Sequence, residues 1–279
     1  MLREEERGTM QIHTLIFTDL DGTLLDDRYD LAGAAAALDA VVDLGAIAIP
    51  VTSKTRRECE ALNRLRRHRS PLIFENGAGI HWEALRRPHM AEVEIEGPGY
   101  DELCRRLRRV RVHGQFHFRG FSMMNAAELA DRCGLALDQA PLALAREATE
   151  PLVWEDTEGS RRAFAEYLSM FRLDLLEGGR FWHVMPETDK GRAAARVVER
   201  WRACFGSVPQ TLGCGDSPND LALLEFTDRC LLFPRRDGSY LELVDKPVSY
   251  ADNPGHEAWL ASVQQLLCSN VLAVREDRA

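Results

Sequence analysis

Short apolar runs separated by amphipathic stretches dominate the first third of the chain. The β-rich apolar runs occupy 13–18, 46–52 and 71–77, and the third is expected to end in a turn. Such runs lack polar alternation, which is typical of strands buried on both faces of a sheet. The stretches 31–45 and 54–68 have helical patterns, and Gly45 is expected to end the first of them. Because strand, helix, strand, helix and strand follow one another, the pattern predicts a parallel α/β sheet with right-handed crossovers.

The same alternation returns in the last third of the chain. Predicted helices cover 189–204, 219–226 and about 254–268, and predicted strands cover 209–214 and 229–233. We therefore expect the two ends of the chain to form halves of one sheet.

The middle of the chain has a different pattern. Helices are expected at 101–111, 126–133 and 160–171, with short strands at 172–177 and 179–185. Mixed α+β content inserted between two halves of a sheet predicts a second domain. The expected organisation is a disordered N-terminal extension over 1–9, a core domain from 10–84 and 186–279, and an inserted domain from 85–185.

Composition narrows the classes of protein that fit this pattern. With 279 residues and 45% hydrophobic content, the chain can form one large domain or two ordinary ones. The formal net charge of −9 argues against a nucleic acid or an anionic membrane surface as partner. The arginines of 105–111 lie beside aromatic residues, but on a helix they point in several directions and are interpreted as a solvated face.

Cysteine usage and the N-terminal residues indicate the compartment. Seven cysteines occur without a C-x-x-C pair, which argues against a disulfide framework or a zinc cluster and favours buried thiols in a reducing environment. The first residues are too charged for a signal peptide, and no run approaches the roughly 20 apolar residues that span a bilayer. We therefore expect a cytoplasmic protein.

Two aspartates follow the first predicted strand. Asp19 and Asp21 lie two positions apart in "FTDLDGTLLD", so both side chains can face the same crevice at the carboxyl end of the sheet, where ligands bind in open α/β folds. Adjacent carboxylates repel unless a cation neutralises them or one keeps its proton. Mg²⁺ is a cation that accepts few carboxylates together with water and phosphate. The alternative is a turn in which the aspartates cap backbone N–H groups.

Further polar residues are expected at the same edge of the sheet. "TLGCGDSPND" presents Asp216 and Asp220 where another strand ends, and these could complete an oxygen site for a divalent cation. Thr52 ends the second strand, where a hydroxyl and nearby N–H groups can bind an anion, and Lys190 could neutralise a phosphoryl oxygen. Taken alone, Thr52 could instead be a helix cap and Lys190 a surface lysine.

The order D-x-D-G-T, strand-terminal Thr, Lys and G-D-S-x-N-D resembles the haloacid dehalogenase (HAD) superfamily of phosphotransferases over nearly the whole chain. The resemblance implies an α/β fold, with an HAD-like Rossmannoid parallel-sheet core and an inserted α+β (type 2B) cap domain. It implies that Asp19 is the nucleophile that forms an aspartyl-phosphate, and that Asp21 protonates the leaving oxygen and later activates water.

The same resemblance implies the remaining site residues. Mg²⁺ would be held by the Asp19 carboxylate, the Asp21 carbonyl and the Asp216 carboxylate, with Asp220 as a further metal-site residue behind them. Thr52 and Lys190 would hold the transferring phosphoryl group.

More narrowly, several segments resemble the mannosyl-3-phosphoglycerate phosphatase family. They are "PVTSKTRRECEAL", "FENGAGI", "GGRFWH", "DKGRA" and "GDSPNDLALL". The resemblance implies a phosphatase that converts mannosyl-3-phosphoglycerate into mannosylglycerate, a compatible solute. The implied substrate-binding residues are Ser53, Lys54, Thr55, Arg180, His183 and Asn219. The cap segment 140–159 follows the family's acidic pattern only loosely, so it does not identify the hexose.

Other functions are compatible with the same residues. The substrate could be another sugar phosphate, such as glucosyl-3-phosphoglycerate or sucrose phosphate, or the enzyme could be a sugar phosphomutase. A non-catalytic sugar-phosphate sensor is disfavoured, because a binding protein has no need of both a nucleophile and a proton shuttle. The sequence has no G-x-x-x-x-G-K-[ST] loop and no G-x-S-x-G motif, which argues against P-loop nucleotide hydrolases and serine esterases.

Overall fold

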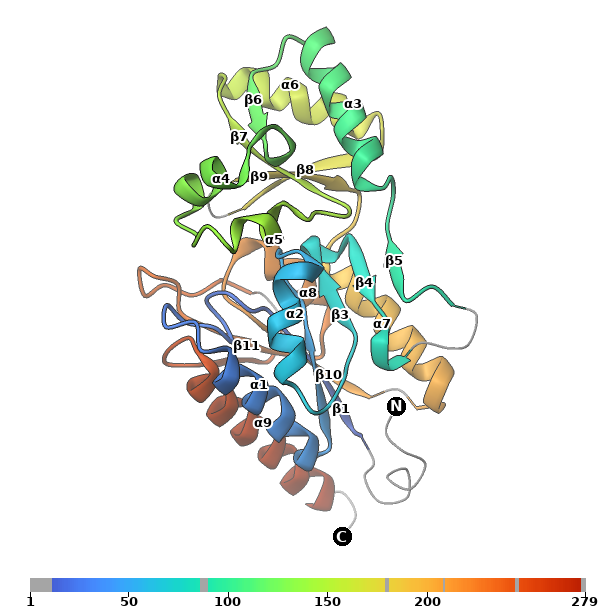
Figure 1. Ribbon diagram of the computed structural model, residues 1–279. Helices are drawn as coiled ribbons and strands as arrows, with labels where there is room; N and C mark the ends of the chain where they lie inside the picture. The colour runs from blue at the N-terminus through green and yellow to red at the C-terminus, as the bar shows by residue number, and fades with distance from the viewer. Residues whose placement is uncertain (1–11, 86–89, 179–180, 208, 244–245, 277–279) are drawn as a thin grey trace.

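The computed structural model describes residues 12–85, 90–178, 181–207, 209–243 and 246–276. Its core is a parallel sheet in the order β12-β11-β10-β1-β2. The strands are β1 (Thr14–Thr18), β2 (Ala46–Pro50), β10 (Gln210–Gly215), β11 (Arg229–Leu232) and β12 (Val248–Tyr250). Strands from both ends of the chain therefore share one sheet, and the prediction of an α/β core is confirmed (Figure 1).

Helices cover both faces of this sheet (Figure 1). One face carries α1 (Leu31–Ala40), α2 (Arg56–Leu65) and α9 (His256–Glu276), and the other carries α7 (Lys190–Phe205) and α8 (Leu221–Phe226). The alternation of side chains along β1 explains both layers, because Ile16 packs in the first apolar cluster while Leu15 and Phe17 pack in the second.

The predicted helix 31–45 and strand 71–77 differ from the observed elements. The first helix is α-helical only to Ala40 and continues as a 3₁₀ turn (Val41–Leu44), which Gly45 ends at φ +73°. The expected strand at 71–77 is only β3 (Leu72–Phe74), and a 3₁₀ turn (Glu75–Gly77) follows it. The residues after Phe74 leave the strand because Glu75 and Asn76 adopt left-handed backbone angles.

The third predicted strand also belongs to a different sheet. β3 pairs in antiparallel fashion with β4 (Gly79–His81), which pairs with β5 (Val93–Ile95). It meets β2's continuation through one parallel bridge between Val51 and Ile73. The expectation of a parallel third strand in the main sheet was therefore wrong, because the turn after Phe74 directs the chain into a hairpin with β4.

The inserted segment forms a third sheet among the described residues, in the order β6-β7-β9-β8 with all neighbours antiparallel. Its elements are α3 (Tyr100–His113), β6 (Phe118–Gly120), α4 (Ala126–Cys133), α5 (Ala140–Leu144), β7 (Glu150–Trp154), α6 (Glu158–Ser169), β8 (Leu173–Glu177) and β9 (Trp182–Pro186). Leu152 packs with α3 and α6, whereas its neighbour Val153 packs with α4 and α5. This sheet and its helices, in green and yellow, stand at one end of the core (Figure 1).

Within the described part of the chain, no helix is long and apolar enough to cross a membrane. None of the seven cysteines, all of which lie in described segments, forms a disulfide bond with another described residue, and five of them are buried. The expected extension over 1–9 lies outside the described residues.

Candidate active site

Strand register brings three sequence-distant loops to one edge of the core sheet. Thr18 of β1 lies opposite Pro50 of β2 and Cys214 of β10. The residues that follow these strands, Asp19, Thr52 and Asp216, therefore leave the sheet side by side. This is the edge at which parallel α/β sheets bind ligands.

Lys190 joins two carboxylates at this edge. It is the first residue of α7, which Asp189 caps through the Arg192 N–H, and the helix start holds the side chain inside the protein. Its Nζ atom donates to Asp19 Oδ1 at 2.7 Å and to Asp220 Oδ1 at 2.6 Å. Lys190 is only 1% exposed, so its interpretation as a surface lysine was wrong. Although burial opposes the charge, Asp19 and Asp220 raise the Lys190 pKa above its usual value.

Asp19, Asp216 and Asp220 form a cluster of carboxylates. One oxygen atom from each lies within 4.8 Å of the others. Burial raises the pKa of Asp19 well above its usual range, and repulsion from Asp220 and Asp216 adds to this although Lys190 opposes it. Burial and the Asp220 charge raise the Asp216 pKa to about 6. A divalent cation fits this donor set, because hard oxygen ligands surround a site whose negative charge Lys190 alone does not balance.

Both carboxylate oxygens of Asp220 accept hydrogen bonds from protein groups. Oδ1 accepts from Lys190, while Oδ2 accepts from the backbone N–H groups of Asp216 (3.1 Å) and Ser217 (3.0 Å). Asp220 therefore holds both the lysine and the loop that carries Asp216. Glycine is required nearby, since a Cβ on Gly215 would lie 2.7 Å from Asp220 Cβ.

Asp21 is also held, although it is more exposed than Asp19. Its Oδ2 lies 2.9 Å from Lys54 Nζ, and its Oδ1 accepts from the Tyr29 hydroxyl at 3.1 Å. The turn around these residues is closed by backbone bonds, from Gly22 N to Leu25 O and from Leu25 N to Leu20 O. The aspartate side chains instead contact Lys190, Lys54 and Tyr29, as a binding site requires and a simple capping turn does not.

The loop after β2 contains the predicted residues 52–55. Thr52 is buried, and its Oγ1 accepts from the Lys54 N–H at 3.2 Å. Thr55 is the residue that caps α2, through a reciprocal pair with Glu58, so the helix-cap role considered for Thr52 belongs to Thr55. The Thr55 hydroxyl also donates to Leu142 O in the inserted domain at 2.8 Å.

The remaining predicted residues are Asn219, His183 and Arg180, and the structure describes the first two. Asn219 Nδ2 donates to Asn76 Oδ1 at 3.1 Å. His183 lies on β9, and its buried Nδ1 has no hydrogen-bond partner among the described residues. Burial, with Arg146 and Lys190, lowers the His183 pKa to about 3, so the ring is neutral at physiological pH. Arg180 lies outside the described residues.

Three residues at this edge were missed by the sequence analysis. They are Tyr29, Glu75 and Arg146. Glu75 is fully buried and Arg146 is 8% exposed, and their side chains meet at the boundary between the core and the inserted domain. A signal for Glu75 was present, because an acidic residue directly after a buried strand occupies the same kind of position as Asp19. Arg146 has no comparable local signal in its sequence.

Comparison with known proteins identifies relatives of the chain. No family model matches the chain. A protein of Persephonella marina, named glucosyl-3-phosphoglycerate/mannosyl-3-phosphoglycerate phosphatase, is 32% identical over 264 residues, which cover 91% of this chain and 97% of the relative. A protein of the same name from Methanococcoides burtonii is 32% identical over 272 residues, with 92% and 98% covered.

A solved structure supports the same fold. A haloacid dehalogenase-like hydrolase from B. subtilis matches with a TM-score of 0.59 and 15% identity, covering 85% of this chain and 95% of the other. At this identity the likeness concerns the fold, which is the HAD-type core with its insertion.

Proposed function

The chain belongs to the glucosyl-3-phosphoglycerate/mannosyl-3-phosphoglycerate phosphatase family, and we propose on this premise that it hydrolyses mannosyl-3-phosphoglycerate to mannosylglycerate and phosphate. Its relatives are phosphatases, so the enzyme class is a phosphoric monoester hydrolase. Glucosyl-3-phosphoglycerate is the second candidate substrate, because the name of both relatives includes it.

One observation supports the reaction type most directly. Lys190 Nζ bonds Asp19 and Asp220 at once, and Asp216 lies beside them. A carboxylate in this position can attack phosphorus, because the lysine and a bound cation offset the repulsion between the carboxylate and a phosphate dianion.

The proposed reaction has two displacement steps at phosphorus. An oxygen of Asp19 attacks the phosphorus atom, the ester P–O bond breaks, and Asp21 donates a proton to the departing glycerate oxygen. Asp21 then takes a proton from water, which attacks the phosphorus of the aspartyl-phosphate and breaks its bond to Asp19. Phosphate leaves, and both carboxyl groups return to their starting states.

The proposed cation is Mg²⁺, with the carboxylates of Asp19 and Asp216 and the carbonyl of Asp21 as protein ligands. When bound, it would supply positive charge against the phosphoryl oxygens. Both oxygens of Asp220 already accept hydrogen bonds, one from Lys190 and the other from backbone N–H groups. We therefore propose that Asp220 positions Lys190 and the 216–217 loop and does not bind the cation directly.

Thr52 and Lys190 are proposed to bind the transferring phosphoryl group, together with Ser53 and Asn219 at the adjoining loops. Lys54 would hold Asp21, since its Nζ lies 2.9 Å from Asp21 Oδ2, and it is also proposed to bind the glycerate carboxylate. His183, with its unpartnered ring nitrogen, and Arg180 are proposed to contact the sugar or glycerate from the inserted domain. Thr55 contributes by holding α2 and the inserted domain rather than by direct contact.

A substrate panel tests the proposal. Phosphate release would be measured with mannosyl-3-phosphoglycerate, glucosyl-3-phosphoglycerate and sucrose phosphate, with and without Mg²⁺ after chelation. We expect kcat/KM for the mannosyl compound to exceed that for sucrose phosphate at least about 100-fold. Sucrose phosphate lacks the glycerate carboxylate, and leaving the cationic groups that would bind it without a partner costs about 3 kcal/mol. A preference for sucrose phosphate would contradict the proposed substrate class, and a sugar-phosphate isomer in place of free phosphate would identify a mutase.

A further inference from the structure

Glu75 occupies an unusual position at the end of β3. It is fully buried, and both it and Asn76 have left-handed backbone angles, with φ of +50° and +58°. Such conformations cost about 1–3 kcal/mol each for residues other than glycine, and they persist where surrounding contacts hold them. The contacts that hold this turn involve both domains.

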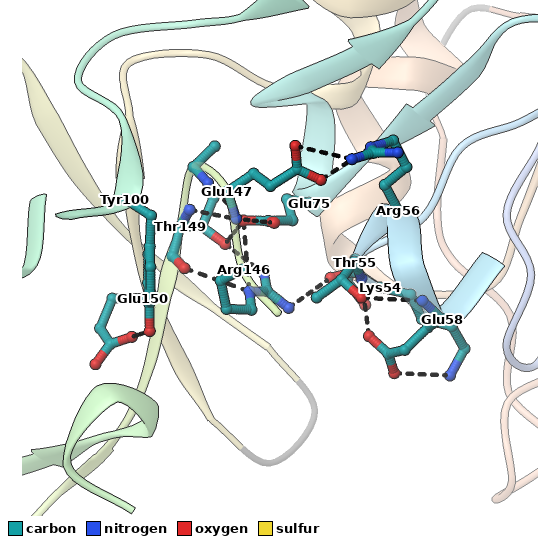
Figure 2. Close-up of polar contacts among 12 residues, drawn as sticks. Lys54, Thr55, Arg56, Glu58, Glu75, Tyr100, Arg146, Glu147, Thr149 and Glu150 are labelled. Atoms are coloured by element: carbon teal, nitrogen blue, oxygen red, sulfur yellow. Dashed lines mark hydrogen bonds and ion pairs between the residues drawn. The ribbon is translucent and has the colours of Figure 1, made fainter. Parts of the chain in front are cut away.

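The Glu75 carboxylate accepts hydrogen bonds from the loop 146–149 of the inserted domain, and among the described residues every donor to it lies in that loop (Figure 2). Oε1 accepts from Glu147 N at 2.7 Å, and Oε2 accepts from Ala148 N at 3.1 Å and Thr149 N at 2.7 Å. The Thr149 hydroxyl adds a bond of 2.9 Å, and Arg146 Nε lies 3.4 Å away. Backbone N–H groups that converge on one carboxylate form a rigid connection between the domains.

The backbone of the same turn holds the loops that carry the proposed phosphoryl-binding residues. Glu75 N donates to Lys54 O at 2.9 Å, and Asn76 N donates to Thr52 O at 2.9 Å. The Asn76 side chain accepts from Asn219, which follows β10. One short turn is therefore bonded through its side chain to the inserted domain and through its backbone to the 52–55 loop.

The 52–55 loop and the start of α2 also touch the inserted domain directly. Arg146 Nη1 donates to Ser53 O at 3.3 Å, and Arg56 Nε lies 2.9 Å from Glu147 Oε1 (Figure 2). The inserted domain therefore contacts the loop that is proposed to bind the phosphoryl group, and the Glu75 turn bonds to the backbone of the same loop.

We propose that Glu75 is a positioning residue that couples the seating of the 146–149 loop to the geometry of the 52–55 loop, so that the phosphoryl site is complete only when the inserted domain is docked. This inference rests on the proposed function, in which the 52–55 loop binds the phosphoryl group. Coupling of this kind is reciprocal, so an oxyanion bound at the site strengthens the docking of the 146–149 loop.

A substitution that keeps shape but changes hydrogen-bonding capacity tests the coupling. In Glu75→Gln, an amide NH₂ group replaces one carboxylate oxygen that accepts hydrogen bonds from backbone N–H groups. Two hydrogen-bond donors then face each other in a buried position, and neither has an acceptor. Glu150→Gln is a matched control, because Glu150 is a buried carboxylate that accepts the Ser122 N–H (2.9 Å) and the Tyr100 hydroxyl (2.6 Å) entirely within the inserted domain.

Three quantities are measured: hydrogen exchange, the inhibition constant of vanadate and kcat. Hydrogen exchange of peptides covering 146–149 and 52–55 would be followed with Mg²⁺, with and without orthovanadate, and the inhibition constant of vanadate would be measured against mannosyl-3-phosphoglycerate hydrolysis. In the wild type and in Glu150→Gln, we expect vanadate to slow exchange in 146–149. In Glu75→Gln, we expect this response to be lost, vanadate inhibition to weaken about 10-fold or more, and kcat to fall about 30-fold or more.

An unchanged Glu75→Gln variant would contradict the proposed coupling. If Glu75→Gln keeps the vanadate response, the inhibition constant and kcat within about 3-fold of wild type, the coupling is wrong even if the variant is less stable. If Glu75→Gln does not fold, Arg146→Lys takes its place, because it removes the planar donor to Ser53 O, and the same three quantities decide. Failure of the wild type to hydrolyse any glycosyl phosphoglycerate would instead reject the proposed function, which this comparison of variants keeps separate.

Discussion

The Nζ atom of Lys190 lies 2.7 Å from Oδ1 of Asp19, although the two residues are 171 positions apart in the chain. The same ammonium group reaches Asp220 Oδ1 at 2.6 Å, and all three side chains are almost completely removed from solvent. A buried charge is tolerated only when it is paired, so each member of this trio depends on the others for stability as well as for any chemistry.

Replacing Lys190 by methionine should therefore affect stability and activity together. Two buried carboxylates would lose their counter-charge, and breaking a buried pair in this way costs about 3–5 kcal/mol. We expect the free energy of unfolding to fall by about that amount in metal-free buffer, and activity to fall by at least about 1,000-fold. Urea titration with and without Mg²⁺ checks this, because the cation should restore part of the lost stability. Equal stability of variant and wild type without Mg²⁺ would show that the lysine does not compensate the carboxylates.

Gly22 should be needed for cation binding rather than only for the turn. Its φ is +79°, and a Cβ there would lie 2.8 Å from Asp216 Oδ2. Gly134→Ala is a matched control, since Gly134 also has a left-handed φ of +63° but has open space where the Cβ would be. Both variants should lose about 1 kcal/mol of stability from the backbone angle. Only Gly22→Ala should raise the Mg²⁺ concentration for half-maximal activity, by about 10-fold or more, and a similar rise in Gly134→Ala would contradict the assignment of Asp216 as a ligand.

His183 should make the protein less stable in mild acid. Its pKa in the folded protein is lowered to about 3 from an ordinary value of 6.5, so the folded state binds fewer protons than the unfolded state between these values. The stability that His183 contributes is therefore complete above pH 6.5 and is lost as the pH falls toward 3. Between pH 6.5 and pH 5 the loss should be about 2 kcal/mol. Denaturant titrations at several pH values should show a smaller loss for His183→Gln, and parallel curves for the two proteins would mean that the ring is solvated.

The edge of the core sheet could be predicted because parallel strands constrain where distant residues lie. Asp19, Thr52 and Asp216 each follow a run of buried β-prone residues, so their gathering follows from the fold class alone. Lys190 was proposed as a cation at a helix start that could neutralise a phosphoryl oxygen, but no local pattern indicates its burial. The burial of Lys190 follows from the packing of α7 against the sheet.

The boundary between the two domains was much less predictable. Glu75 and Arg146 are 71 positions apart in the chain (146 − 75). The pattern of helices and strands gives no indication that their side chains are in contact. β3 ends at Phe74 because the next two residues, Glu75 and Asn76, take left-handed angles. The 146–149 loop holds the Glu75 side chain in this turn, and such a long-range contact leaves no periodicity in the sequence.

The most direct test of the central claim is to trap the phosphorylated residue during turnover. Wild type and Asp19→Asn would be mixed with mannosyl-3-phosphoglycerate and Mg²⁺, quenched within milliseconds, and treated with borohydride, which reduces an aspartyl-phosphate to homoserine that mass spectrometry locates. We predict modification at Asp19 in the wild type only, and loss of phosphate release in a folded Asp19→Asn variant by at least about 10,000-fold. Modification at another residue, or turnover retained by Asp19→Asn, would contradict the assignment of Asp19 as the nucleophile.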